Sequence, residues 1–189
     1  MFKTDCFSAM LILWCSMIIF PLHSVHAASP VSFSADYIEV SDGQKTEGKY
    51  YAGPQGIRME GVSDGEKTLM IVNFPQSVSW IVQVEEEMYY EMPFSPEDSG
   101  TFLNPCPELK KGKQAGRETM AGRSVEKWQC EGWDGSVDTV WFDDRLKATV
   151  RREGADGTVF ELRNIKEGTV SKDLFQLPEG YTKIVIPGS

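Results

Sequence analysis

Histidine is missing from most of this sequence. The chain of 189 residues has two histidines, His23 and His26, and both lie within the first 27 residues. The rest of the sequence therefore lacks Ser-His and Cys-His catalytic pairs, the usual zinc ligands and the commonest general base near neutral pH. These absences predict a protein that is not an enzyme and that holds no metal or other cofactor.

Positive charge is also scarce. The sequence has 19 Lys and Arg residues against 28 Asp and Glu residues, so its formal net charge at pH 7 is −9. Binding to nucleic acid requires clustered cations that neutralise phosphates. The composition therefore argues against a nucleic acid partner and against adsorption to anionic lipid headgroups.

The first 27 residues have the three parts of a secretory signal peptide. Lys3 supplies the positive charge, residues 7–20 are mainly apolar, and Ala27 ends a short polar stretch. We expect cleavage after Ala27, with Ala28 as the near alternative. An uncleaved anchor is the other interpretation, but a membrane-spanning helix needs roughly 20 apolar residues and this run is shorter. We expect residues 28–189 to form a single domain that works as a monomer outside the cytoplasm.

Cysteine is sparse as well. Cys6 and Cys15 lie in the signal peptide, so only Cys106 and Cys130 remain. In an oxidising compartment such a pair predicts one disulfide. It would close a loop of roughly 24 residues, which the chain-entropy estimate values at about 3 kcal/mol. A redox or metal pair is the alternative, but the spacing is too wide for a CxxC motif.

Turn signals, in contrast, recur at short intervals. Four Asp-Gly pairs begin at Asp42, Asp64, Asp134 and Asp156, and such pairs favour the positive φ angles of type I′ turns in tight hairpins. Runs rich in β-branched and aromatic residues flank them, which predicts a mainly β protein with a meander of antiparallel strands. The expected strands are Val31–Val40, Thr46–Ala52, Ile57–Gly61, Lys67–Asn73, Ser77–Val84, Met88–Met92, Gly116–Ala121, Ser124–Cys130, Val137–Phe142, Ala148–Glu153, Thr158–Ile165 and Thr182–Ile186.

Alternation predicts which faces are buried. Trp80, Val82 and Val84 share one face of their strand, whereas residues 69–72 are apolar on both faces. Such a strand is covered on two sides, as in a curved sheet wrapped around a core or a pocket. Residues 94–113 break the rhythm and predict a loop with short helices packed across the sheet. A last helical turn is expected at 171–175, capped by Ser171.

Two groups of acids could in principle perform acid-base chemistry, as paired carboxylates do in glycosidases. These are Glu85-Glu86-Glu87 and Asp143-Asp144. Both groups directly follow predicted strands, so we interpret them as charged turns, and we expect no catalytic residue in this chain.

Aromatic and methionine side chains are plentiful, and they could line an apolar pocket. Methionine suits loosely specified apolar ligands because its side chain is flexible and polarizable. An ordinary hydrophobic core is the alternative interpretation of the same residues. The candidate pocket residues are Trp80, Val82, Met88, Tyr90, Met92, Trp128, Trp141, Phe160 and Leu162.

The order of several short motifs resembles the LolA/LolB-like superfamily of periplasmic lipoprotein-sorting proteins. The motifs lie at residues 33–37, 53–60, 116–128, 140–143 and 174–181. Together they span nearly the whole predicted mature chain, and the sequence is nearest an uncharacterised exported branch of that superfamily. The resemblance implies an incomplete, half-open antiparallel barrel of about 10–12 strands, with short helices covering the open side. In the carrier of that system, the cavity receives the acyl chains of a lipoprotein.

Three departures from the carrier stand out. The carrier has a longer N-terminal helix before its first strand. It also has an arginine directly before a proline that helps to latch its lid, where this chain has Gly53 before Pro54. The receptor of that system is a lipoprotein, and Cys15 follows Trp14 rather than the small residue that lipidation needs. The fold therefore transfers better than the carrier mechanism does.

Two hypotheses follow for the partner. The first is a non-enzymatic periplasmic protein that holds a lipid, a lipoprotein acyl chain or another apolar ligand in the half-barrel. The second is an envelope protein-interaction or sensor module, because some LolA-like domains sense envelope stress by binding a partner protein. In that case side chains would fill the cavity.

Overall fold

Twelve β-strands in one sheet make up almost all of the regular structure. The computed structural model describes residues 31–94, 104–106 and 111–185, so the predicted signal peptide and most of the predicted loop helices lie outside the described residues. The strands are β1 (Phe33–Ser41), β2 (Gln44–Gly53), β3 (Gly56–Ser63), β4 (Glu66–Asn73), β5 (Val78–Gln83), β6 (Met88–Pro93), β7 (Lys111–Met120), β8 (Arg123–Glu131), β9 (Val137–Asp143), β10 (Ala148–Glu153), β11 (Val159–Glu167) and β12 (Thr182–Lys183).

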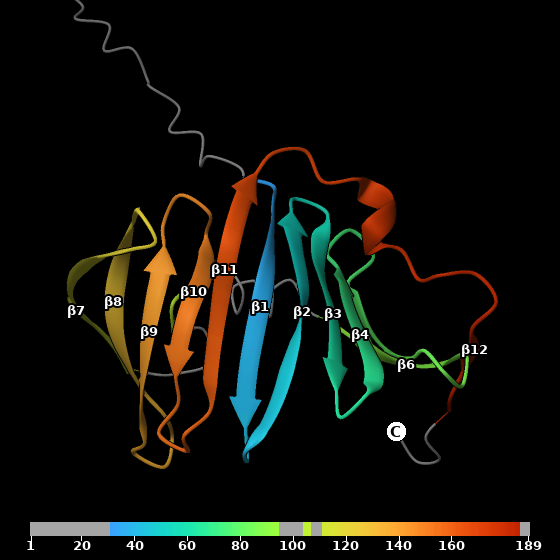
Figure 1. Ribbon diagram of the computed structural model, residues 1–189, viewed down its shortest axis with the longest axis horizontal. Coiled ribbons are helices and arrows are strands. Elements are labelled where there is room, and N and C mark those ends of the chain that lie inside the picture. The colour runs from blue at the N-terminus through green and yellow to red at the C-terminus, as the bar shows by residue number, and fades with distance from the viewer. Residues whose placement is uncertain (1–30, 95–103, 107–110, 186–189) are drawn as a thin grey trace, which may run out of the picture.

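The sheet is two antiparallel meanders joined along β1 and β11. Its strand order is β12-β6-β5-β4-β3-β2-β1-β11-β10-β9-β8-β7. All neighbours pair antiparallel except β12, which runs parallel to β6. The sheet curves strongly without closing, so its concave face forms the inside of a half-open barrel (Figure 1). The predicted mainly β, half-open antiparallel barrel is therefore confirmed.

The Asp-Gly turns divide into two kinds. At Asp42-Gly43 and Asp64-Gly65 both residues have positive φ angles, as type I′ turns require. In the pairs that begin at Asp134 and Asp156, only the glycine has a positive φ. There the aspartate carboxylate instead accepts a hydrogen bond from the backbone N–H two residues later. The expectation of a type I′ turn was wrong for these two pairs, because an Asx-type bond holds a longer loop.

One end of the half-barrel is filled by side chains. We call it the filled end; it is the end where β1 begins and lies uppermost in Figure 1. Phe33, Ile57, Val72 and Leu146 are all less than 5% exposed there and belong to one hydrophobic cluster. The pocket between Phe33, Ile57 and Leu146 measures only about 20 Å³, so these side chains leave little free space.

A buried carboxylate fixes the turn after β9 at the filled end. Asp143 is 2% exposed and accepts hydrogen bonds from the backbone N–H groups of Arg145 (3.0 Å) and Leu146 (3.1 Å). The Arg123 guanidinium also donates to it and to Glu167. A buried charge needs such partners, so Asp143 has a structural role.

The C-terminal segment covers the outer face of β4 and β5. The 3₁₀ helix η1 (Lys172–Phe175) begins after Ser171, whose hydroxyl accepts a hydrogen bond from the Asp173 N–H, as the sequence predicted. Phe175 is 1% exposed, and its carbonyl accepts a hydrogen bond from the Asn73 side chain (2.8 Å). Leu177 and Tyr181 then pack on a cluster of Leu69, Ile71, Trp80 and Val82. This cover explains why β4 is apolar on both faces.

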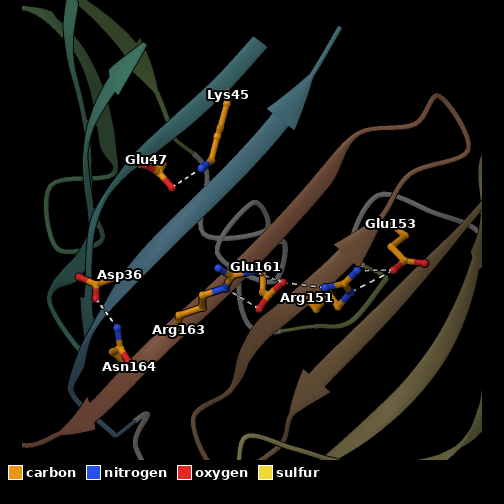
Figure 2. A network of polar contacts seen from close by, with 8 residues as sticks. All are labelled: Asp36, Lys45, Glu47, Arg151, Glu153, Glu161, Arg163 and Asn164. Carbon is orange, nitrogen blue, oxygen red and sulfur yellow. Dashed lines mark hydrogen bonds and ion pairs between the residues drawn. The ribbon is translucent and has the colours of Figure 1, made fainter. Parts of the chain in front are cut away.

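Charged side chains occupy the rest of the outer face near β1. Arg151 lies between Glu153 and Glu161, and Arg163 also contacts Glu161 (Figure 2). Asp36 accepts hydrogen bonds from Lys49 and from Asn164. The carboxylates drawn on this outer face therefore all have a cationic or amide partner.

Candidate ligand-binding cavity

The opposite end of the half-barrel is hollow. We call it the hollow end; it is the end where β1 finishes, lowermost in Figure 1, and it holds a cavity of about 1100 Å³. Ligand sites in proteins typically measure about 300–1,000 Å³. The cavity is lined by Tyr37, Glu39, Thr46, Tyr50, Met59, Glu66, Lys67, Thr68, Leu69, Met70, Ile81, Val82, Gln83, Glu85, Glu86, Pro105, Cys130, Asp138, Val140, Thr149, Arg152, Thr158 and Phe160.

Aromatic rings form the inner wall of the cavity, where it meets the filled end. Tyr37 on β1 and Tyr50 on β2 both lie against Phe160 on β11, with ring centroids 6.2 and 6.3 Å apart. Met59 and Met70 continue this wall along β3 and β4, because the register places them side by side and beside Tyr50. Opposed residues of antiparallel strands project on the same face, so five large side chains form one apolar surface.

The absence of a side chain at Gly61 makes room for the Tyr37 hydroxyl. Gly48 and Gly61 are directly opposed on β2 and β3, and a Cβ atom at Gly61 would lie 2.1 Å from the Tyr37 hydroxyl oxygen. The ring therefore reaches across two strands to hydrogen-bond with Thr68. Burial raises the pKa of the Tyr37 hydroxyl, and the nearby Glu39 carboxylate raises it further. Burial alone raises the pKa of Tyr50, so both phenols are neutral at physiological pH.

The rim of the cavity is polar. Strand ends and turns place Glu39, Glu66, Glu85 and Glu86 at the mouth, together with Lys67. On the opposite wall Asp138 and Arg152 form an ion pair of 3.2 Å. An apolar interior with a few charged groups at its entrance suits an amphiphilic molecule better than a fully polar one.

The disulfide Cys106–Cys130 closes one side of this cavity. Its two Cα atoms are 5.5 Å apart, and the structure thus contains the predicted bridge. Cys130 and Pro105 both line the cavity, and Trp128 packs against the cluster formed by the two cysteines and Val140. The bridge therefore fixes residues 104–106 beside β8 at the hollow end.

The predicted pocket residues fall into three groups. Phe160 and Val82 are among the residues that line the cavity, although the Val82 side chain also belongs to the outer-face cluster with Trp80. Met88, Tyr90 and Met92 lie on β6 directly opposite Gln83, Ile81 and Ser79 of β5, and they extend the same face of the sheet beyond the cavity lining.

The other four lie away from the cavity. Trp80 points to the outer face, where the C-terminal segment covers it and its indole N–H donates to Glu91. The Trp141 indole N–H donates to Glu118, and Lys127 and Arg151 lie over its ring. Leu162 belongs to the packed core, and Trp128 supports the disulfide. Sequence alternation identified shared faces but could not say which face was the inside.

Several wall residues were missed, namely Tyr37, Tyr50, Met59, Met70 and Ile81. Each of these residues follows the two-residue alternation of its strand, so the sequence already contained the signal that assigns it to one face. The missing information was the register, which sets these residues side by side across β1 to β5.

The acids considered for catalysis have other surroundings. Asp143 is engaged by backbone and guanidinium donors, as described above. Glu85 and Glu86 are exposed in the turn after β5. Among residues 31–94, 104–106 and 111–185, no group of three or more His, Cys, Asp or Glu side chains could hold a metal ion. In the same part of the chain, no helix is long and apolar enough to cross a membrane.

Comparison with known proteins supports the fold and little else. No protein-family model and no curated protein sequence matches this chain. Among solved structures, an uncharacterized conserved protein from Thermus thermophilus superposes with a TM-score of 0.59 and 10% identity, over 82% of this chain and 90% of that one. These values define a shared fold class, the half-open antiparallel barrel.

A second structural relative is MucB. It superposes with a TM-score of 0.50 and 12% identity, over 80% of this chain and 59% of that one. A chain of the Pseudomonas aeruginosa MucA/MucB complex gives a TM-score of 0.51, also at 12% identity, over 82% of this chain and 58% of that one. This chain thus spans less than two thirds of the MucB chain, and the likeness is one of fold.

Proposed function

We propose that this protein is an exported, non-enzymatic binding protein that holds an acyl chain or a similar apolar ligand in the hollow end. The observation that carries the proposal is the open cavity of about 1100 Å³ above a wall of aromatic and methionine side chains. An alternative with side chains filling the barrel does not account for that volume. The disulfide Cys106–Cys130 supports an oxidising compartment such as the periplasm.

The energetics of such binding are sufficient. Burying one CH₂ group contributes about 0.8 kcal/mol, so a twelve-carbon chain contributes roughly 10 kcal/mol before association costs. Those costs amount to about 4 kcal/mol at the lower end of the estimates. The remaining roughly 6 kcal/mol corresponds to a dissociation constant of about 40 μM, so a single acyl chain can supply binding in the range of tens of micromolar with no catalytic group required.

A matched pair of variants tests the proposal. Ile81 lines the cavity and is 43% exposed, whereas Val62 is 47% exposed and lies on the outer face of β3. Ile81→Trp would occupy part of the cavity, and Val62→Trp would add the same ring outside it. We expect the first variant to weaken binding of a fluorescent twelve-carbon probe about tenfold or more, and the second to leave it unchanged.

Native mass spectrometry of freshly purified protein provides an independent readout. A bound mass in the range of a lipid, absent from the Ile81→Trp variant, supports the proposal. The proposal fails if no lipid co-purifies and no apolar probe binds to the unaltered chain.

A second candidate function is the binding of an extended protein segment. The observation that favours it is β7, a strand of ten residues at one edge of the sheet whose side chains are almost all exposed. Exposed edges can pair with a strand from another chain. The same mass spectra would then show a bound polypeptide, and Ile81→Trp would not displace it.

A further inference from the structure

The mouth of the cavity carries an unbalanced charge. Five carboxylates line the cavity against two cationic side chains. Arg152 is already paired with Asp138, and Lys67 is the other cationic residue of the lining. The remaining carboxylates are those of Glu39, Glu66, Glu85 and Glu86. These four acids come from β1, from the start of β4 and from the turn after β5, and all lie at the hollow end.

The four rim carboxylates differ from those on the outer face. Outside, Asp36 and Glu161 are each held by Lys, Arg or Asn side chains (Figure 2). Within the described part of the chain, none of the four rim carboxylates forms an ion pair. The sheet thus neutralises its outer acids and leaves the acids at the cavity mouth uncompensated.

An unpaired negative rim over an apolar interior selects a ligand by its charge. A cleft lined by charges of one sign, with walls of low dielectric constant, concentrates ions of the opposite sign and repels those of its own. Below the rim, Tyr37, Tyr50 and Phe160 present aromatic rings, which attract a cationic group that reaches them.

We infer that the ligand is an amphiphile with a positively charged head, whose apolar tail enters the cavity while its head remains among the rim carboxylates. This inference rests on the proposed function and specifies its ligand class. A free fatty acid or another lipid with an anionic head would place its charge against Glu39, Glu85 and Glu86, and would bind more weakly than a cation with the same tail.

Three probes with one tail test the inference. Dodecyltrimethylammonium, dodecyl maltoside and dodecanoate share a twelve-carbon chain and carry a positive, a neutral and a negative head. In calorimetric titrations at low salt, below the micellar concentrations, we expect the cation to bind about tenfold or more tighter than the anion. At 1 M salt, where the Debye length is roughly 3 Å, we expect this ratio to shrink to about threefold or less.

Charge-removing variants localise the effect to the rim. The double variant Glu85→Gln/Glu86→Gln removes two rim charges in an exposed turn. The control Glu47→Gln/Glu179→Gln removes two exposed carboxylates elsewhere, so the net charge changes equally. We expect the cation-to-anion ratio to fall at least about threefold in the rim variant, with binding of dodecyl maltoside unchanged, and to stay constant in the control.

The outcomes separate this inference from the proposed function. If all three probes bind equally to the unaltered chain, the cavity is a ligand site but the head-group inference is overturned. An equal fall of the ratio in both variants also overturns it, because net charge alone would then suffice. If no probe binds, the proposed function itself fails.

Discussion

The two ends of the half-barrel are built from the same strands and differ in what lies between them. At the filled end the void is about 20 Å³, whereas at the hollow end it is about 1100 Å³. Along the inner face of β1, the sequence runs from Phe33 through Tyr37 to Glu39. Along β4 it runs from Val72 through Met70 to Glu66. The inner face thus changes from apolar to charged along the length of a single strand.

This difference shows that folding and binding use separate parts of one sheet. The filled end supplies the packed core, and removing atoms from it creates a void. The hollow end is packed less completely around its cavity, and it also carries the disulfide and the outer ion pairs of Glu161. Substitutions at the two ends should therefore have very different effects on stability.

The largest expected effect is at the filled end. Phe33 is 1% exposed, so Phe33→Ala should lower the free energy of unfolding by about 3–5 kcal/mol. Ile81→Ala at the hollow end should lower it by less than about 1 kcal/mol, because Ile81 is 43% exposed. Urea unfolding measures both values. Equal losses would show that the two ends are packed alike.

An intermediate effect is expected from the disulfide, which we assign to the hollow end. Replacing both Cys106 and Cys130 by Ser should cost about 3 kcal/mol by the chain-entropy estimate. We expect probe binding to weaken as well, since residues 104–106 would no longer be fixed beside the cavity. Thermal unfolding and probe titration of the double variant test this, with Ser136→Ala on a nearby turn as a control. Unchanged probe binding would show that the disulfide is not needed for the cavity to bind its ligand.

The smallest effect on stability is expected from the ion pairs of Glu161, which lie on the outer face of the sheet. Hydrogen bonds from Arg163 and the charges of Arg163 and Arg151 lower the pKa of Glu161. A carboxylate whose pKa is lower in the folded state stabilises the protein above its unfolded pKa of about 4.5, and this contribution disappears as the pH falls through the folded value.

The corresponding variant is Glu161→Gln. At pH 7 it should cost about 1 kcal/mol or less, because the network is partly exposed. It should also flatten the dependence of unfolding free energy on pH below about 4.5. Urea titrations between pH 7 and 3 provide the measurement. The role given to Glu161 is contradicted if the variant and the unaltered chain lose stability in parallel.

Most of the fold could be predicted from local sequence. Period-two alternation and recurrent turn signals located ten of the twelve strands to within two residues at each end, because each strand carries its own hydrophobic pattern. One exception is β12, which ends at Lys183, whereas the expected strand ran to Ile186. The other is β7, which begins at Lys111 rather than at the expected Gly116. Its first residues, Lys-Gly-Lys-Gln-Ala, are exposed at a sheet edge, so no burial pattern marks them.

The candidate site was less predictable. Only Val82 and Phe160 of nine proposed pocket residues line the cavity. Trp80 and Trp141 have the composition of pocket residues, yet they lie under the C-terminal segment and under Lys127 and Arg151. Residue type alone does not show whether a large apolar side chain lines a cavity or packs elsewhere, because its position depends on contacts between distant segments.

The sequence by itself determined the β-strands, the alternation of their faces, the disulfide pair and the helical turn after Ser171. These are properties of short segments or, for the cysteines, of having only one pairing available. The tertiary structure alone decided which face is concave, which segment covers β4 and β5, and which end stays hollow. Those features depend on strand register and curvature, and on the close approach of Tyr37 to Gly61, which joins residues far apart in the chain.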